Sequence, residues 1–95
     1  MNDGLAGFRR RIDDCDAQII RLINQRLKIC QEVGDFKAER GLEISIPDRE
    51  REVISKALGL NDGPCPPEAL EKIFRLLIDT AVSLEEAGEA AHPES

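Results

Sequence analysis

The chain has 95 residues, of which 41% are hydrophobic and 34% are charged, and its formal net charge is −6. This length allows one domain with one modest core, and the apolar content is too high for a disordered segment. Because the chain is acidic and only 3% of its residues are aromatic, it is a poor general binder of nucleic acid or anionic membrane. A small anionic substrate would therefore need a local cluster of cations.

Targeting and cysteine patterns place the protein in the cytoplasm. The first eight residues lack the apolar segment of a signal peptide, and no apolar run approaches the ~20 residues of a transmembrane helix. Cys15, Cys30 and Cys65 form no metal-type C-x-x-C pair, so we expect reduced thiols and no metal site. The only histidine, His92, is expected to be a solvated residue near the C-terminus.

A long amphipathic helix is predicted from Leu5 to about Glu39, and Gly41 is a natural stop for it. The spacing between its apolar residues alternates between three and four, which places them on one face. This apolar stripe consists of Leu5, Phe8, Ile12, Cys15, Ile19, Leu22, Ile23, Leu27, Cys30, Val33 and Phe36.

Two further helices follow. One is predicted to start within residues 45–48, where Ser45 can cap it, and to end near Leu60. The turn-rich residues 61–67 form a loop, and Pro67 opens a third helix that continues to about Glu86. The helical core therefore covers about 5–86, and 87–95 are expected to form a flexible polar tail.

The first helix is too long for a compact domain of this size. At ~1.5 Å per residue, a helix of ~35 residues is about 50 Å long, whereas a compact domain of this length is roughly 30 Å across. The two shorter helices cannot cover the whole stripe, so a second copy of the chain is expected to cover the remainder. The predicted fold is all-α, with a single domain over residues 1–95. It has three helices per protomer, one long, one short and one medium, in an intertwined helical homodimer.

Two cations interrupt the stripe, because Arg26 and Lys37 stand where a seven-residue spacing calls for apolar side chains. They are eleven residues apart and share a helix face, with Cα atoms about 16 Å apart. Two extended basic side chains at this distance can close on a small dianion. Arg9 is too far along the helix to join them within one chain, but the partner's Arg9 can arrive there in an antiparallel dimer.

The pattern leaves other interpretations open. Arg26 and Lys37 can extend their charged ends to solvent or pair with acidic residues such as Glu50. Glu85 shares a face with Ala81 near the third apolar stripe, yet it can equally be a solvated carboxylate in a last turn. The chain offers no Ser/His/Asp or Cys/His set and no Gly-rich phosphate loop.

Four short segments are informative when they are taken together. They are F-R-R-R-I-D at residues 8–13, L-I-N-Q-R at residues 22–26, a V-G-x-x-K motif at residues 33–37 and D-R-E-R at residues 48–51. In this order they resemble the all-helical chorismate mutases, over roughly residues 5–86. The resemblance implies three helices per protomer, and an intertwined dimer with shared active sites.

The resemblance also implies roles for the matching residues. Arg26, together with Arg9 from the other protomer, binds the two substrate carboxylates. Lys37 binds a carboxylate and the ether oxygen of the breaking bond. Glu50 accepts a hydrogen bond from the ring hydroxyl, and Arg49 supports the site electrostatically.

Three substrate-binding positions depart from the pattern of bacterial relatives. Ile46 stands where an Asp is common, and Ala81 stands where a Ser often contacts a carboxylate. Glu85 occupies the position of a Gln or Glu that donates to the ether oxygen. Because only a protonated carboxyl can donate, we expect Glu85 to work protonated, with its pKa raised by burial.

The implied activity is the isomerisation of chorismate to prephenate, a shikimate-pathway step towards phenylalanine and tyrosine. This intramolecular rearrangement requires a compact substrate conformer and positive charge at the ether oxygen, and it uses no cofactor. Lys37, Glu85, Arg26 and Glu50 are the expected catalytic residues. The alternatives are an isochorismate-pyruvate lyase of the same fold and a non-catalytic helical dimerisation or regulatory module.

Overall fold

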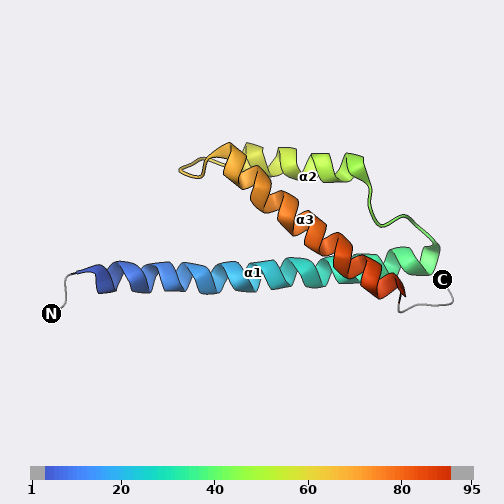
Figure 1. Cartoon of the computed structure of the whole chain (residues 1–95), viewed down its shortest axis with the longest axis horizontal. Helices are drawn as coiled ribbons and strands as arrows, with labels where there is room; N and C mark the ends of the chain where they lie inside the picture. Colours follow the sequence, from blue (N-terminus) through green and yellow to red (C-terminus); the bar gives the residue numbers. More distant parts are fainter. Residues whose placement is uncertain (1–3, 91–95) are drawn as a thin grey trace.

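The computed structural model describes residues 4–90 as three α-helices joined by two short loops (Figure 1). α1 spans Leu5–Arg40, α2 spans Pro47–Leu60 and α3 spans Pro67–Ala90. The predicted all-α fold class is therefore confirmed. Residues 1–3 and 91–95, among them His92, lie outside the described residues. None of the three helices is long and apolar enough to cross a membrane.

The end of α1 is built by a glycine, as the sequence predicts. Gly41 adopts a left-handed conformation with φ of 66°, which only glycine adopts without steric cost. Its backbone N–H donates to the carbonyl of Ala38 at 3.3 Å, and the N–H of Leu42 donates to the carbonyl of Lys37 at 2.9 Å. This pair of bonds is a Schellman motif, and it turns the chain back directly after Lys37.

The start of α2 differs from the prediction that Ser45 caps the helix. Ile46 is the N-cap residue, in an extended conformation with φ of −123° and ψ of 100°, and Pro47 opens the helix. Because a proline forces the residue before it out of the helical region, the cap position falls on Ile46, one residue later than predicted. The Ser45 hydroxyl instead donates to Glu50 Oε2 at 2.9 Å.

The loop before α3 is held by one asparagine. Asn61 Nδ2 donates to the carbonyl of Cys65 at 2.8 Å, and Asn61 Oδ1 accepts from the N–H of Gly63 at 3.1 Å. These side-chain bonds replace the backbone ladder that ends with α2. The loop therefore reverses the chain compactly, and α3 starts at Pro67, as predicted.

The end of α3 lies beyond the predicted one. The helix continues to Ala90 rather than to about Glu86, so the expected polar tail is wrong for residues 87–90. Packing against α1 gives the physical reason, since a methyl group on Gly88 would lie 3.6 Å from Asp35 Oδ1. Helix propensity alone understates helices that are held by a neighbouring element.

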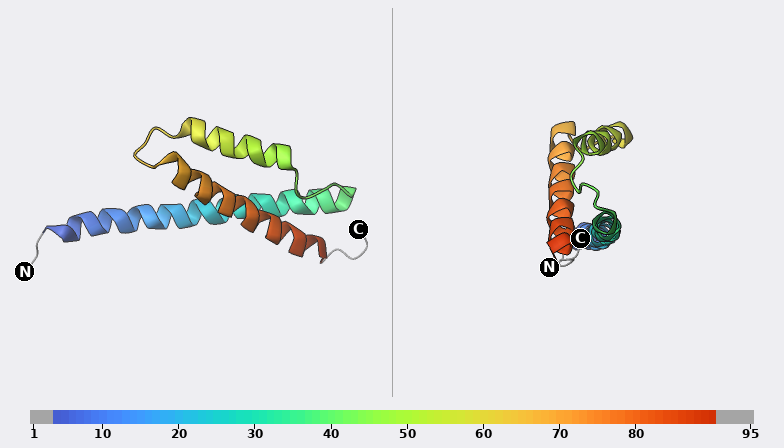
Figure 2. Two further views of the ribbon diagram at one scale, coloured as in Figure 1. Left: turned by 45° about the horizontal axis from the view of Figure 1, so that its top comes forward. Right: turned by 90° about the vertical axis from the view of Figure 1, so that its right-hand side faces the viewer.

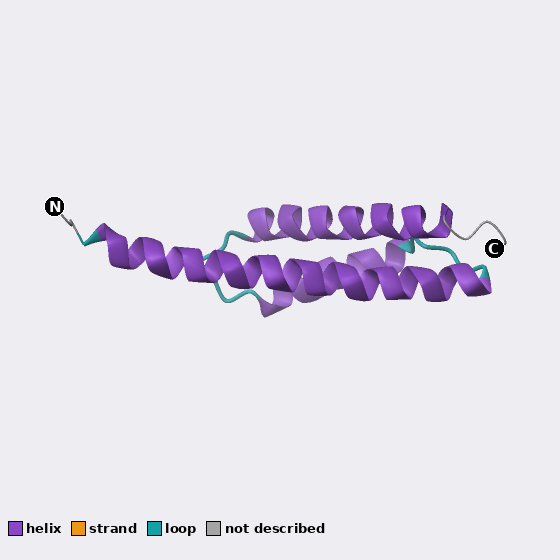
Figure 3. Cartoon of the chain, turned by 90° about the horizontal axis from the view of Figure 1, so that it is seen from below, coloured by secondary structure: helices purple, strands orange, loops and turns teal. Residues whose placement is uncertain are grey.

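The helices do not form a compact bundle. α3 packs against both other helices, on the C-terminal half of α1 with its own C-terminal half and on α2 with its N-terminal half (Figures 1 and 2). The N-terminal half of α1 extends past the other two helices (Figure 3). The radius of gyration is 17.4 Å, against the ~12 Å of a compact domain of this length.

The core of one chain is correspondingly small. Its buried apolar residues are Ala38, Ala57, Ile78 and Ala81. Much of the α1 stripe is instead exposed, with more than a third of each side chain accessible at Leu5, Phe8, Ile12, Ile19, Leu22, Val33 and Phe36. A single chain therefore leaves uncovered the apolar face that the length of α1 predicts to need a partner.

Candidate active site

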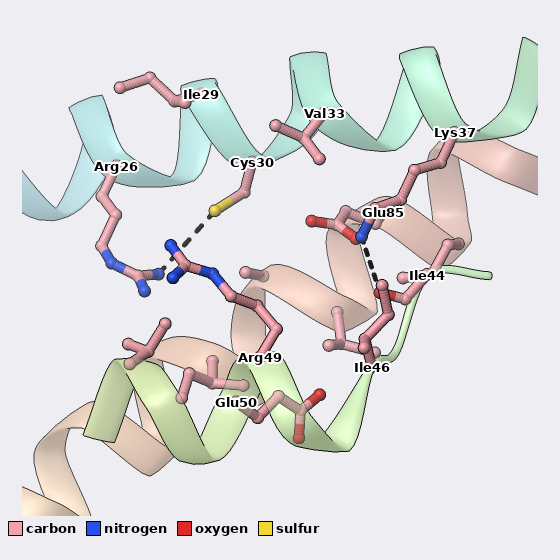
Figure 4. A pocket seen from close by; sticks show the side chains of 14 residues that line it. Arg26, Ile29, Cys30, Val33, Lys37, Ile44, Ile46, Arg49, Glu50 and Glu85 are labelled. Carbon is pink, nitrogen blue, oxygen red and sulfur yellow. Dashed lines mark hydrogen bonds between the residues drawn. The ribbon is translucent and has the colours of Figure 1, made fainter. Parts of the chain in front are cut away.

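A pocket of about 320 Å³ lies between the three helices (Figure 4). Its volume suits a small organic ligand. The pocket contains all but one of the eight predicted substrate-binding residues, namely Arg26, Lys37, Ile46, Arg49, Glu50, Ala81 and Glu85. The remaining wall is largely apolar and consists of Ile29, Cys30, Val33, Ile44, Val53, Ile78 and Val82.

Arg26 reaches into the pocket from α1 (Figure 4). Its guanidinium contacts Cys30 Sγ at 3.8 Å, a weak hydrogen bond between neighbours one turn apart. Among the described residues Arg26 has no acidic partner within ion-pair distance, and the alternative pairing with Glu50 is therefore wrong. The guanidinium keeps most of its donors for a ligand.

Lys37 is held on the same face of α1, about three turns further on. Its Nζ donates to the backbone carbonyl of Ile44 at 3.0 Å, in the loop that the Schellman motif turns back (Figure 4). One of the three ammonium donors is therefore engaged, and two are left for a ligand. Ile44 was not predicted, since backbone carbonyls carry no sequence signal.

The two charged residues from α2 have partners of different kinds. Arg49 is exposed and pairs with Glu52 one turn along the same helix. Glu50 is more buried, and its Oε1 accepts from Arg75 of α3 at 3.1 Å while its Oε2 accepts from Ser45. Arg75 and Ser45 were missed by the sequence analysis, because Arg75 is 25 residues from Glu50 and no local spacing links them.

Glu85 is the one buried charged residue of the described chain, with 7% of its surface exposed. The interpretation as a solvated last-turn carboxylate is therefore wrong. Burial raises the pKa of this carboxyl above its usual value, and the opposing effect of the Lys37 charge is smaller. The fold thus favours the protonated form, which can donate a hydrogen bond.

The two uncharged substitutions both lie at the pocket. Ile46 lines it from the start of α2, and 43% of its surface is exposed. Ala81 lines it from α3 and is buried. Their methyl groups offer apolar contact at positions where an Asp or a Ser would offer hydrogen bonds.

Arg9 does not reach this pocket within one chain. It lies on the exposed N-terminal half of α1, seventeen residues before Arg26, a distance of about 26 Å along the helix. No arginine side chain spans that distance. A second protomer is the only source of the partner Arg9 that the resemblance implies.

Positive charge prevails in the pocket, against the negative charge of the whole chain. Three cations, Arg26, Lys37 and Arg49, face two carboxyl groups. One of these, Glu50, is engaged by Arg75, and the other, Glu85, has a raised pKa. Such a site attracts a small anion and places donors around it. Residues 4–90 contain no group of acidic, cysteine and histidine side chains able to hold a metal ion.

Comparison with known proteins points to one enzyme family. Residues 8–86 match the family model described as chorismate mutase type II. A chorismate mutase of Methanocaldococcus jannaschii is 31% identical over 80 residues, which cover 83% of this chain and 81% of that relative. A bifunctional chorismate mutase/prephenate dehydratase of Aquifex aeolicus is 39% identical over 92 residues, which cover 93% of this chain and 25% of that relative. The chain thus spans about a quarter of the bifunctional relative.

Solved structures agree with the sequence comparison. The Form II structure of chorismate mutase from Thermus thermophilus superposes with a TM-score of 0.83 at 32% sequence identity, covering 86% of this chain and 93% of that chain. The Form I structure from the same organism gives a TM-score of 0.78 at 30% identity, covering 81% and 96%.

The raised pKa of Glu85 predicts a pH-dependent stability difference between the wild type and a Glu85→Gln variant. The unfolded carboxyl titrates near its model value of 4.5, and the folded one titrates higher. The native state therefore binds the proton more tightly, and this contribution, fully present below pH ~4.5, is lost as pH rises through the folded pKa. The variant should gain stability relative to the wild type between about pH 4 and about pH 8, as measured by urea unfolding.

The matched control is Glu86→Gln, the same change at the adjacent exposed position. Both variants and the wild type are compared at one chain concentration, since association changes apparent stability. A Glu85→Gln difference that stays constant or declines with rising pH would show that Glu85 is not held protonated by the fold.

Proposed function

Because this chain belongs to the chorismate mutase type II family, we propose that it is an isomerase that rearranges chorismate to prephenate. The observation that carries the proposal is the gathering of Arg26, Lys37 and Arg49 around one small pocket in an acidic chain. A dianionic substrate accounts for this arrangement, because each of these cations is costly to desolvate without an anion.

The reaction breaks one carbon–oxygen bond and forms one carbon–carbon bond within the same molecule, so the protein supplies geometry and charge. Arg26 from α1 and a partner Arg9 clamp the two carboxylates and hold the chain of the substrate over its ring. This restriction selects the compact conformer that reacts, an effect worth several kcal/mol, up to ~7–11 in well-oriented systems. Arg49 adds positive potential from α2.

Lys37 and Glu85 act at the ether oxygen, which gains electron density as its bond to carbon breaks. Lys37 keeps ammonium donors free beyond its bond to Ile44, and a protonated Glu85 donates its O–H from the opposite helix. Donors fixed in advance at a developing negative charge stabilise the transition state more than the ground state. Both side chains are oriented by the fold before the substrate binds.

Glu50 accepts the hydrogen bond of the ring hydroxyl. Its two oxygens already accept from Arg75 and Ser45, and each keeps a further lone pair for the substrate. Ile46 and Ala81 provide apolar contact. The hydroxyl that Ala81 lacks corresponds to one neutral hydrogen bond, worth about 1 kcal/mol of binding.

A homodimer completes this site. The exposed apolar face of α1 requires cover, and an antiparallel second α1 both buries it and carries Arg9 towards the pocket that Arg9 cannot reach in its own chain. The two active sites are then shared between protomers. A cytoplasmic location fits the free thiols of Cys15, Cys30 and Cys65.

The product fits the company that this family keeps. In the Aquifex aeolicus relative the chorismate mutase is joined to a prephenate dehydratase. A prephenate-forming chain supplies such an activity, on the route to phenylalanine and tyrosine.

The first test is the loss of chorismate absorbance on addition of the purified chain. We expect turnover to prephenate, and we expect Arg26→Ala to lower kcat/KM about 100-fold or more, because it removes a charged clamp. Lys72→Ala, which removes an exposed cation of α3 outside the pocket, is the matched control. Isochorismate is assayed in parallel for pyruvate release. Pyruvate release without chorismate turnover would identify a lyase, and inactivity on both would leave a non-catalytic module.

The shared site is tested by mixing two inactive variants. Arg9→Ala and Arg26→Ala homodimers each lack one clamp in both sites, whereas a heterodimer has one site with both clamps intact and one site with neither. After unfolding and refolding as an equal mixture, about a quarter of wild-type activity should return, since half the dimers are mixed and each has one complete site. Mixing without exchange of chains is the control. No recovery after refolding would contradict a shared site.

The role of Glu85 predicts a pH profile. The rate should fall as pH rises through the raised pKa, because the ionised carboxylate no longer donates and repels the ether oxygen. Glu85→Gln, which keeps the donor without titrating, should flatten the fall. A wild-type rate that is level from acid to alkaline pH would refute the protonated-donor role.

A further inference from the structure

A very close contact between α1 and α3 lies at Gly34, which is buried and directly opposite Glu85. A methyl group placed on Gly34 would lie 2.8 Å from Glu85 Cγ, 3.0 Å from its Cβ and 3.2 Å from its Cα. Ordinary carbon–carbon contacts are about 3.5–4.0 Å. Since the Cα belongs to the backbone, a rotamer change of Glu85 cannot relieve the overlap, and α3 would have to move.

This contact also determines where the Glu85 carboxyl lies. The Cβ and Cγ of Glu85 rest on the bare backbone of α1, which removes the side chain from solvent and directs it into the pocket beside Lys37 (Figure 4). Lys37 is three residues after Gly34 and lies close enough for its charge to act on Glu85. The spacing of glycine and lysine on α1 thus matches the stem and the head of one glutamate on α3.

We propose that Gly34 is a positioning residue for the reaction: its missing side chain allows Glu85 to lie against α1 and to present its carboxyl beside Lys37. The proposal rests on the proposed function for the reaction that Glu85 assists, whereas the placement itself rests on the contact alone. Gly34 touches no substrate and acts only through Glu85.

The charged groups that bear on Glu85 come from two helices. Lys37 and Arg26 line the same pocket from α1, and Arg49 and Glu50 line it from α2. Moving Glu85 outward by a fraction of an ångström separates it from Lys37 and admits water. Both its aim at the ether oxygen and its preference for the protonated form should then weaken.

The test compares Gly34→Ala with Gly88→Ala. Both changes add one methyl group inside a helix and raise helix propensity alike, but the methyl on Gly88 meets only Asp35 Oδ1, at an ordinary 3.6 Å. We expect Gly34→Ala to lower kcat about tenfold or more with KM changed by less than about threefold, and to shift the fall in rate to lower pH. Gly88→Ala should stay within about twofold of the wild-type kcat.

A double-mutant cycle separates positioning from general damage. In a Glu85→Ala background nothing is left to position, so adding Gly34→Ala should change kcat by less than about twofold. A similar loss in both backgrounds, or a wild-type kcat and pH profile in Gly34→Ala itself, would overturn the proposal.

Stability measurements decide the matter without activity, and so distinguish this proposal from the proposed function. The pH-dependent stability difference that Glu85→Gln produces should shrink by about half or more when it is measured in a Gly34→Ala background. An unchanged difference would overturn the placement even if the chain is an active mutase. If Gly34→Ala fails to fold, the double variant Gly34→Ala/Glu85→Ala should unfold at a higher temperature, since it removes the 2.8 Å contact. Equal instability of both variants would refute the role of Glu85 in the contact.

Discussion

The crossing of α1 and α3 is the contact on which the rest of this structure depends. Small residues form it, with Gly34 and Ala38 buried on α1 and Ala81 buried on α3, so the two backbones approach closely. This approach excludes water from Glu85 and places its carboxyl against the cationic face of α1. One packing constraint therefore determines both the position of a helix and the protonation preference of a catalytic group.

Charge is organised around this crossing by separation. Arg26 and Lys37 stay without acidic partners in the described chain, while the nearby acid Glu50 is engaged by Arg75 and Ser45. The pocket thus keeps positive potential within a chain of net charge −6. A site built in this way stabilises a dianion by electrostatics that precede binding, which suits a rearrangement in which charge moves within one molecule.

The protomer buries little apolar surface and leaves much of α1 uncovered, and the same helix carries a cation that cannot reach the site of its own chain. Stability and activity therefore make the same demand on a second copy. A second antiparallel α1 would satisfy both with one surface. In such an arrangement folding, association and completion of the active site are a single process, and stability depends on chain concentration.

The helices of this protein were predictable from sequence, because apolar periodicity, Gly41 and Pro67 act locally. The cations at positions 26 and 37 were predictable too, since they break a local pattern. Packing decided what sequence did not: the cap at Ile46, the last turn of α3 up to Ala90, the Arg75–Glu50 ion pair and the burial of Glu85. Each of these depends on a neighbour outside the local pattern, and no spacing along one helix records how closely another helix approaches.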